Sequence, residues 1–157
     1  MSLFKQTMGM RAWAFKNVFL LFLVKPTIVE LSDSRCVVKV PLNWRTRNHL
    51  RSMYFGALCI GADVAGGLIA FELMRKRKAG FSFVFKDMKA EFLKRPEGDV
   101  LFTNLDGAIV VDLVKRAIET GERQEATVNV VATVPSKMGD EPVAKFAMTL
   151  SLKKRSS

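Results

Sequence analysis

The sequence predicts an α+β protein in which an antiparallel sheet of about six strands curls around one long, very apolar helix. The helix is indicated by residues 53–78, which are apolar on every side of a helical wheel over most of their length. A helix that is apolar all round must be buried on all sides, and a curled sheet is the economical cover for it. The strands are indicated by segments in which apolar side chains recur at every second residue.

Length and composition bound the remaining possibilities. The 157 residues are 49% hydrophobic and 25% charged, which suits one domain with one sizeable core and excludes disordered and fibrous classes. Lysine and arginine total 25 against 15 acidic residues, so the net charge is +10. This balance favours a polyanionic partner: nucleic acid, an anionic membrane or a small ligand that carries phosphate. We expect a single domain over residues 1–157, with an N-terminal helix in 1–25, a core in 26–153 and a basic tail at 154–157.

The scarcity of histidine and cysteine excludes several chemistries. His49 is the only histidine, which excludes a zinc site built from several histidines, and no nucleophile-elbow motif accompanies it. We expect neither a metal nor a cofactor. The two cysteines, Cys36 and Cys59, are too few for a disulfide scaffold and fit a reducing cytoplasm, although one bridge between them stays possible.

The N-terminal segment has the outline of a signal peptide. Residues 18–24 form an apolar run that follows three basic residues. Lys25 and Pro26 come next in place of a small-residue cleavage site, and seven residues are too few to span a bilayer. We therefore expect an N-terminal helix that ends before Pro26 and packs on the rest of the domain.

A hairpin and a loop precede the central helix. Residues 28–31 and 36–42 alternate as strands do, and the turn between them lies at Ser32–Ser34. A polar and basic loop then leads to Ser52, the expected N-cap of the central helix, which ends before Gly80.

The chain beyond the central helix returns to strand periodicity. Residues 81–94 predict a long strand in which the apolar parity switches, and this switch indicates a bulge near Lys86 and Asp87. The rest of the chain predicts a short strand at 100–103, a helix at 107–120 that Asp106 caps and Gly121 ends, and a final hairpin of strands at 126–134 and 143–152 joined by a loop.

The central helix must be distinguished from a membrane span. Nineteen residues from Met53 to Phe71 carry one charge, on Asp63, and would just suffice to cross a bilayer. An aspartate near the bilayer midplane costs about 2.5–3.5 kcal/mol, and the amphipathic strands need this helix as their cover, so we expect no membrane span. Four glycines in the helix each cost about 0.8–1.0 kcal/mol relative to alanine, which indicates close approach of the sheet or of a partner helix.

Asp63 is the most informative residue, because it places a carboxylate in a helix that must be buried. An unpaired buried charge is costly, so Asp63 has a partner, a raised pKa or a cavity that holds water. Its helical neighbours are mostly small, which leaves space for a ligand channel or a trapped water. Pairing with a basic residue of the sheet, or a hydrogen bond across a helix–helix seam, is an equally open alternative.

The start of the central helix suggests an anion site. Arg45, Arg47 and Arg51 precede it, and its free N–H groups carry the positive end of the helix dipole. The same amides could stabilise an oxyanion that develops within reach. The alternative for the arginines is a solvated surface loop.

Two stretches resemble hot-dog-fold thioesterases of the phenylacetate-pathway type. In that signature, an Asn is followed after five residues by His-Gly-Gly, and an apolar helix carries an Asp seven residues beyond the second Gly. Asn48, Gly56 and Asp63 match it without a gap, and residues 92–99 are similar to the family's Phe-Leu-Arg-Pro and Gly-Asp turn. The likeness covers most of residues 26–153, and the additional helices look like an uncharacterised thioesterase-like branch.

The resemblance implies a hot-dog fold, a homodimer or homotetramer, and an acyl thioester ligand, usually acyl-CoA. It implies that Asp63 is the base or nucleophile and that Asn48 positions water. It also implies that the backbone amide of Phe55 in the other subunit polarises the thioester carbonyl, with Gly56 supporting the close turn. Tyr54 and Phe55 stand where the family has His-Gly, so Tyr54 either donates a hydrogen bond in place of the His or fills the core.

The carboxylate of Asp63 and the backbone amides at the helix start suit thioester hydrolysis. This reaction needs one carboxylate, one water and one or two preorganised hydrogen-bond donors. The positive charge fits the phosphates of coenzyme A. We therefore predict a cytoplasmic acyl-CoA thioesterase. The alternatives are a module that binds acyl chains or acyl-CoA without turnover, and a basic binder of nucleic acid or anionic membrane, of which nucleic acid is less expected because no recognised motif supports it. The candidate phosphate-binding residues are Arg45, Arg47, Arg51, Lys86, Lys89, Lys94 and Arg95.

Overall fold

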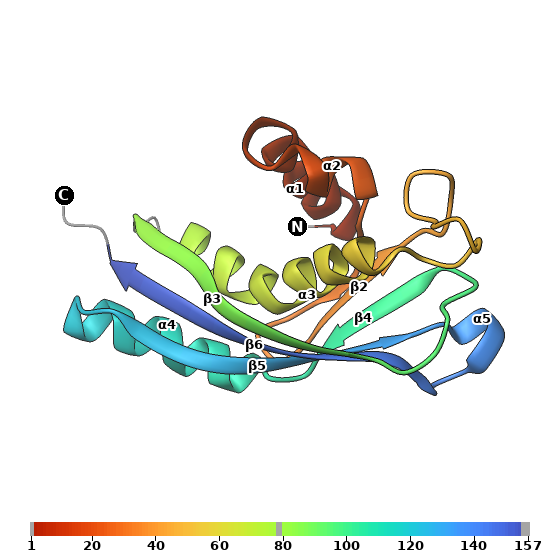
Figure 1. The fold of residues 1–157 in the computed structure, drawn as a ribbon. Coiled ribbons are helices and arrows are strands. Elements are labelled where there is room, and N and C mark those ends of the chain that lie inside the picture. Colours follow the sequence, from red (N-terminus) through yellow and green to blue (C-terminus); the bar gives the residue numbers. More distant parts are fainter. Residues whose placement is uncertain (1, 78–79, 155–157) are drawn as a thin grey trace.

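The computed structural model describes residues 2–77 and 80–154, and one antiparallel sheet of six strands dominates it (Figure 1). The strand order across the sheet is β1-β2-β4-β5-β6-β3. The strands are β1 (Thr27–Leu31), β2 (Cys36–Val40), β3 (Phe81–Phe92), β4 (Val100–Asn104), β5 (Gln124–Thr133) and β6 (Pro142–Lys154), and the helices are α1 (Leu3–Asn17), α2 (Phe19–Val24), α3 (Phe55–Lys76), α4 (Gly107–Thr120) and α5 (Pro135–Met138).

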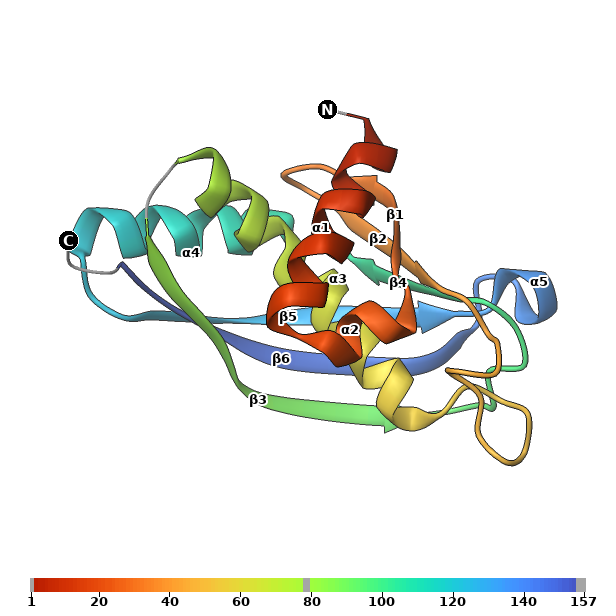
Figure 2. The ribbon, with the colours of Figure 1, turned by 90° about the horizontal axis from the view of Figure 1, so that it is seen from above.

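The long helix α3 lies in the concave face of the curved sheet, and α1 and α2 lie on the other side of α3 (Figures 1 and 2). Helix α4 packs against α3, β5 and β6. A sheet wrapped around one central helix is the hot-dog fold, so the predicted fold class, with its additional N-terminal helix and its helix near 106–121, is confirmed.

Helix α3 is the core of the molecule, as its apolar sequence predicts. It is long and apolar enough to cross a membrane, yet 72% of an apolar stretch of 18 residues within it is buried inside the protein. The glycines allow this burial, because a Cβ at Gly61 would overlap the fully buried ring of Phe102 on β4. A Cβ at Gly67 would likewise lie 2.8 Å from the ring of Phe83 on β3. The close approach of the sheet that compensates these glycines is therefore confirmed.

Strand β3 forms one edge of the sheet. It pairs with β6 along its whole length, and the register shifts between Phe85 and Asp87, where the bulge was predicted. Its second edge has no strand beside it in the described chain. The bulge moves alternate side chains of β3 from one face to the other, which explains the change in apolar parity.

The N-terminal segment differs from the prediction, because it forms two helices rather than one. Val18 leaves the helical conformation, with φ −144° and ψ 80°, and separates α1 from α2. This break turns the chain so that Leu21 and Val24 reach the core. The rings of Phe15 and Phe22 pack against each other across it, with their centres 5.1 Å apart.

The start of the central helix also differs from the prediction. Ser52 is not its N-cap: α3 begins at Phe55, and Tyr54 occupies the cap position without a side-chain hydrogen bond to the helix. The backbone N–H of Met53 donates to Pro96 at 2.9 Å and that of Tyr54 donates to Thr46 at 2.8 Å. These bonds to distant loops hold residues 53 and 54 outside the helix, which local sequence cannot indicate.

Helix α4 lies where it was predicted, between Asp106 and a left-handed Gly121 with φ +71°. Asp106 is the N-cap residue, as predicted, but its carboxylate makes no hydrogen bond to the helix. It accepts hydrogen bonds instead from the backbone and side-chain nitrogens of Asn129 on β5, at 2.7 and 2.9 Å. The short helix α5, within the predicted loop between β5 and β6, was not predicted.

Candidate active site

Asp63 lies in the middle of α3 and faces a cavity of about 360 Å³. The described residues offer its carboxylate neither a hydrogen bond nor an ion pair, so the predicted alternative of a basic partner or a seam hydrogen bond is not realised among them. The residues that line the cavity are Met10, Trp13, Val18, Leu21, Asp63, Val64, Gly67, Leu68, Phe71, Phe83, Val84 and Phe85.

Burial changes the acid–base chemistry of this carboxyl group. Loss of hydration raises the pKa of Asp63 from 3.8 to about 6, because the charged form is deprived of water without gaining a partner. A carboxyl group with a pKa of about 6 is still mostly ionised at neutral pH and is a stronger base than an ordinary aspartate. Asp63 therefore has the properties of a general base or nucleophile beside an apolar cavity.

The first turn of α3 presents backbone N–H groups without partners. In the described part of the chain, the amides of Phe55, Gly56 and Ala57 donate no hydrogen bond, whereas Leu58 N–H donates to the carbonyl of Tyr54. The side chains of Tyr54 and Phe55 are about half exposed, and their rings pack together with their centres 4.8 Å apart. A Cβ at Gly56 would overlap the ring of Tyr54. Glycine at position 56 thus lets this ring lie across the helix start.

Asn48 organises the loop before the helix. Its side-chain oxygen accepts hydrogen bonds from the backbone of Leu50 at 2.9 Å, and from the backbone and hydroxyl of Ser52 at 3.2 and 3.3 Å. These bonds close a tight turn in which Arg51 has a positive φ of 63°. Asn48 does not line the cavity that contains Asp63. Its predicted role in positioning water stays a prediction that relies on its free amide nitrogen.

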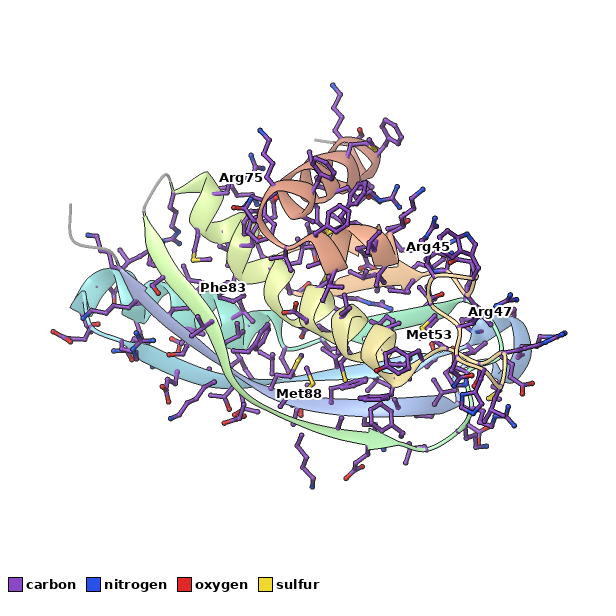
Figure 3. All side chains as sticks on the ribbon, turned by 45° about the horizontal axis from the view of Figure 1, so that its top comes forward. Arg45, Arg47, Met53, Arg75, Phe83 and Met88 are labelled. Carbon is purple, nitrogen blue, oxygen red and sulfur yellow. The ribbon has the colours of Figure 1, made fainter. Side chains whose placement is uncertain are left out.

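Three of the candidate arginines gather beside the start of α3. Figure 3 shows Arg45 and Arg47 at the end of the molecule where Met53 lies, whereas Arg75 lies at the opposite end of α3. No ion pair forms from Arg45, Arg47 or Arg51 to a carboxylate of the described residues. The guanidinium of Arg45 lies 5.3 Å from the centre of the Trp44 ring, and its buried Nε has no hydrogen-bond partner among residues 2–77 and 80–154.

The other basic candidates have partners of their own. Lys86 pairs with Glu125 at 2.9 Å, Lys89 pairs with Glu91 at 3.6 Å, and Lys94 pairs with Glu141. Arg95 donates to the carbonyl oxygen of Leu50 at 3.0 Å, which brings its guanidinium to the same loop as the three arginines. Among the candidate basic residues, therefore, the ones without a carboxylate partner in the described chain are Arg45, Arg47, Arg51 and Arg95.

The part of the site that sequence reasoning missed is the outer wall of the cavity. Trp13 of α1 contacts Phe71 of α3, with ring centres 5.3 Å apart, and Leu21 of α2 is buried against the same helix. The apolar run at residues 18–24 was the available signal. It indicated that a helix packs on the body but not that the helix borders the space around Asp63.

The chain matches the model of one protein family over most of its length. Residues 5–152 match the model of the family described as a domain of unknown function, DUF4442, and the chain belongs to this family. A search of curated proteins found no match.

Solved structures share the fold over nearly the whole chain. A Chlorobaculum tepidum protein of unknown function aligns with a TM-score of 0.82 at 10% identity, covering 98% of both chains. A Pseudomonas aeruginosa protein named as a probable thioesterase aligns with a TM-score of 0.72 at 21% identity, covering 94% of this chain and 96% of its own. A variant of a second Pseudomonas aeruginosa thioesterase aligns with a TM-score of 0.69 at 14% identity, covering 94% of each chain. At these identities the likeness shows the fold.

Proposed function

We propose that this member of the DUF4442 family hydrolyses acyl thioesters, usually of coenzyme A, with Asp63 as the catalytic carboxylate. The observation that carries the proposal is the carboxylate on the central helix, which is largely buried, has no partner in the described chain and faces an apolar cavity. Solved structures with this fold that are named as thioesterases support the reaction class.

The hydrolysis requires no group that the chain lacks. The carboxylate of Asp63 accepts a proton from water while the water oxygen attacks the thioester carbonyl carbon. Backbone N–H groups stabilise the resulting oxyanion. When the tetrahedral intermediate collapses, the C–S bond breaks, and the thiolate takes the proton from Asp63 to give a free thiol and a carboxylic acid. Direct attack by the carboxylate would give the same products through an anhydride that water then cleaves.

The site needs a second copy of the chain. Phe55 and Asp63 are eight residues apart on one helix, which separates them by about 12 Å along its axis. One carbonyl group cannot lie within about 3 Å of both. We therefore propose a homodimer in which the amide of the partner subunit's Phe55 faces the Asp63 of this chain, as the sequence resemblance implies.

The free edge of β3 supports this assembly. Val84, Met88 and Phe92 are exposed apolar residues along β3, and the ring of Phe92 lies 6.1 Å from that of Phe55 at the start of α3. An edge strand with apolar side chains readily pairs with a second copy, and a twofold axis makes such a contact self-complementary. Pairing along β3 would join the exposed edge and the helix start in one interface.

The arginines around the helix start are the proposed contacts for the phosphates of coenzyme A. Arg45, Arg47 and Arg51 carry charge that no carboxylate of the described residues neutralises, and Arg95 reaches the same loop. Bidentate guanidinium groups suit phosphate oxygens. Lys89 contributes less in this proposal, because Glu91 already pairs with it.

The proposal is tested by thiol release from a panel of short, long and aromatic acyl-CoAs. We expect turnover by the wild type and a loss of at least about a hundredfold in Asp63→Asn, equivalent to roughly 2.7 kcal/mol of transition-state stabilisation. Asp140→Asn is the matched control, because Asp140 is an exposed aspartate in the loop between β5 and β6. This control should retain the wild-type rate.

Two results would reject the assignment. Turnover that is unchanged in Asp63→Asn would mean that this carboxylate is structural. No turnover of any acyl-CoA by an intact dimer would instead favour a module that binds acyl-CoA or acyl chains without hydrolysis, and Asp63→Asn would then alter binding or stability alone.

A second candidate function, association with an anionic membrane surface, is favoured by the N-terminal helices. Of the twenty large apolar side chains that are exposed in the described chain, nine lie between residues 3 and 23, including Phe4 and Leu20 at 75% and 66% exposure. The first 29 residues contain four basic residues and no acidic one. An exposed apolar helical face flanked by positive charge suits the interface of an anionic bilayer.

Vesicle cosedimentation tests this second function. We expect binding to vesicles made of equal parts phosphatidylcholine and phosphatidylglycerol, with little binding to phosphatidylcholine alone. The double variant Phe4→Ser, Leu20→Ser should lose this binding, whereas Leu105→Ser, at a residue that is also 66% exposed but lies outside α1 and α2, should keep it. Equal binding to both vesicle types, or an unaffected double variant, would contradict the proposal.

A further inference from the structure

The cavity beside Asp63 is elongated along α3 and carries charge at one end only. Asp63, Gly67 and Phe71 recur at intervals of four residues and so line it from the same side of the helix. The eight residues from Asp63 to Phe71 correspond to about 12 Å of helix rise. Among the described residues that line it, Asp63 alone has a charged side chain. This polarity matches a ligand with one polar group at the end of an apolar chain.

The size of the cavity limits the length of such a chain. The cavity of about 360 Å³ far exceeds the roughly 10–15 Å³ of such space that a single water needs, so it has room for an alkyl chain. An extended alkyl chain advances about 1.3 Å per carbon, given single bonds of about 1.5 Å. About 12 Å of cavity therefore corresponds to about nine carbons in a straight chain.

We infer that this cavity binds the acyl chain of the thioester substrate and selects chains of about nine carbons. The inference rests on the proposed function, since it places the reacting carbonyl near Asp63 and the chain along α3. Trp13 and Phe71, whose ring centres lie 5.3 Å apart, border the end of the cavity that is farther from Asp63.

The chain-length limit is set by a part of the molecule that lies outside the sheet and its central helix. Trp13 belongs to α1, whereas Val18 and Leu21 come from the junction with α2 and from α2 itself. These helices are fixed in place by Arg11, whose guanidinium donates to the carbonyl of Pro26 at 2.9 Å and to the hydroxyl of Thr27 at 2.8 Å. These bonds tie α1, which carries Trp13, to the start of β1.

Binding of non-hydrolysable thioether analogues of acyl-CoA tests the inference without hydrolysis. Burial of each methylene should tighten the dissociation constant about fourfold, up to about nine carbons, after which longer chains should bring no gain. A dissociation constant that is independent of chain length, or that continues to improve well beyond this limit, would overturn the inference.

Variants of the wall sharpen the test. Trp13→Ala opens the end of the cavity and should move the preferred chain to greater length, whereas Val18→Trp narrows the cavity and should move it to shorter length. Leu105→Ala removes an exposed apolar side chain that does not line the cavity, and it should leave the profile unchanged. Wall variants that fold normally and keep the wild-type chain-length profile would also overturn the inference.

Failure of the inference differs from failure of the proposed function. Hydrolysis that depends on Asp63 but not on chain length would leave the thioesterase proposal standing and reject the chain site. Binding that depends on chain length without any hydrolysis would support the chain site and reject the enzyme.

Discussion

At the scale of single residues, Asp63 combines a structural cost with chemical usefulness. Its carboxyl group is largely surrounded by the apolar core, and no residue of the described chain compensates its charge. A pKa raised from 3.8 to about 6 corresponds to about 3 kcal/mol of lost stability when the group is ionised. Functional sites commonly retain such unfavourable groups, because the same environment makes them reactive.

This cost predicts that Asp63→Asn stabilises the protein. Between pH 3.8 and about 6 the folded protein binds more protons than the unfolded chain, so the wild type loses stability as the pH rises through this window. At pH 7 the variant should be more stable than the wild type by up to about 3 kcal/mol. Below pH 3.8, where the carboxyl group is neutral in both states, the difference should vanish.

Urea unfolding at both pH values measures this difference, with Asp140→Asn as the control. A variant that is less stable than the wild type at pH 7 would show that the carboxylate has a stabilising partner.

Sequence reasoning could single out Asp63, because a lone charge in an apolar helix stands out against its neighbours. The same reasoning could not determine the contacts of Asn48, whose oxygen is occupied by Ser52 and Leu50. It also could not tell that Lys86 forms an ion pair whereas Arg45 forms none in the described chain. The partner of Lys86 is Glu125, which lies 39 positions away in the sequence. Contacts of this kind depend on how strands align, which composition and spacing do not encode.

At the scale of the elements, the glycines of α3 determine how closely the sheet can approach. Gly61→Ala should destabilise the protein by about 1–3 kcal/mol, because the added Cβ overlaps the buried ring of Phe102. Gly9→Ala is the control, since it lies within α1 and a Cβ there meets nothing within 4 Å. That variant should be more stable by about 0.8–1.0 kcal/mol through helix propensity. Chemical denaturation compares the two, and a neutral or stabilising Gly61→Ala would contradict the close packing.

Strands and helices were predictable where their apolar residues recur at one regular spacing along the whole element. The alternation along β3 and β6 and the apolar run of α3 identified these elements and the bulge at Phe85–Asp87. Helix ends were less predictable, because Met53 and Tyr54 are held outside α3 by bonds to Pro96 and Thr46. The division between α1 and α2 depends on packing of Leu21 and Val24 in the same way.

At the scale of the whole molecule, the proposed site requires two copies of the chain. Met88→Lys places a charge in the middle of the free β3 edge, where Met88 is 38% exposed, and should therefore prevent strand pairing between copies. We expect a monomer with little remaining thiol release, because the amide of the partner subunit's Phe55 is lost from the site.

Val29→Lys, at an exposed residue on β1 at the opposite edge of the sheet, is the matched control and should stay dimeric and active. Sedimentation velocity together with thiol release measures both properties. A Met88→Lys monomer with full activity would show that one chain contains the complete site.

The dependence of kcat/KM on pH, measured for thiol release from the preferred acyl-CoA, shows whether the ionised carboxylate of Asp63 performs the chemistry. If ionised Asp63 is the base or nucleophile, kcat/KM falls about tenfold per pH unit below the pKa, which lies at about 6, and is level above it. Asp63→Asn should lose both the rate and this dependence. A rate that is constant between about pH 5 and 7, or the same inflection in an active Asp63→Asn variant, would contradict the claim that this carboxylate performs the chemistry.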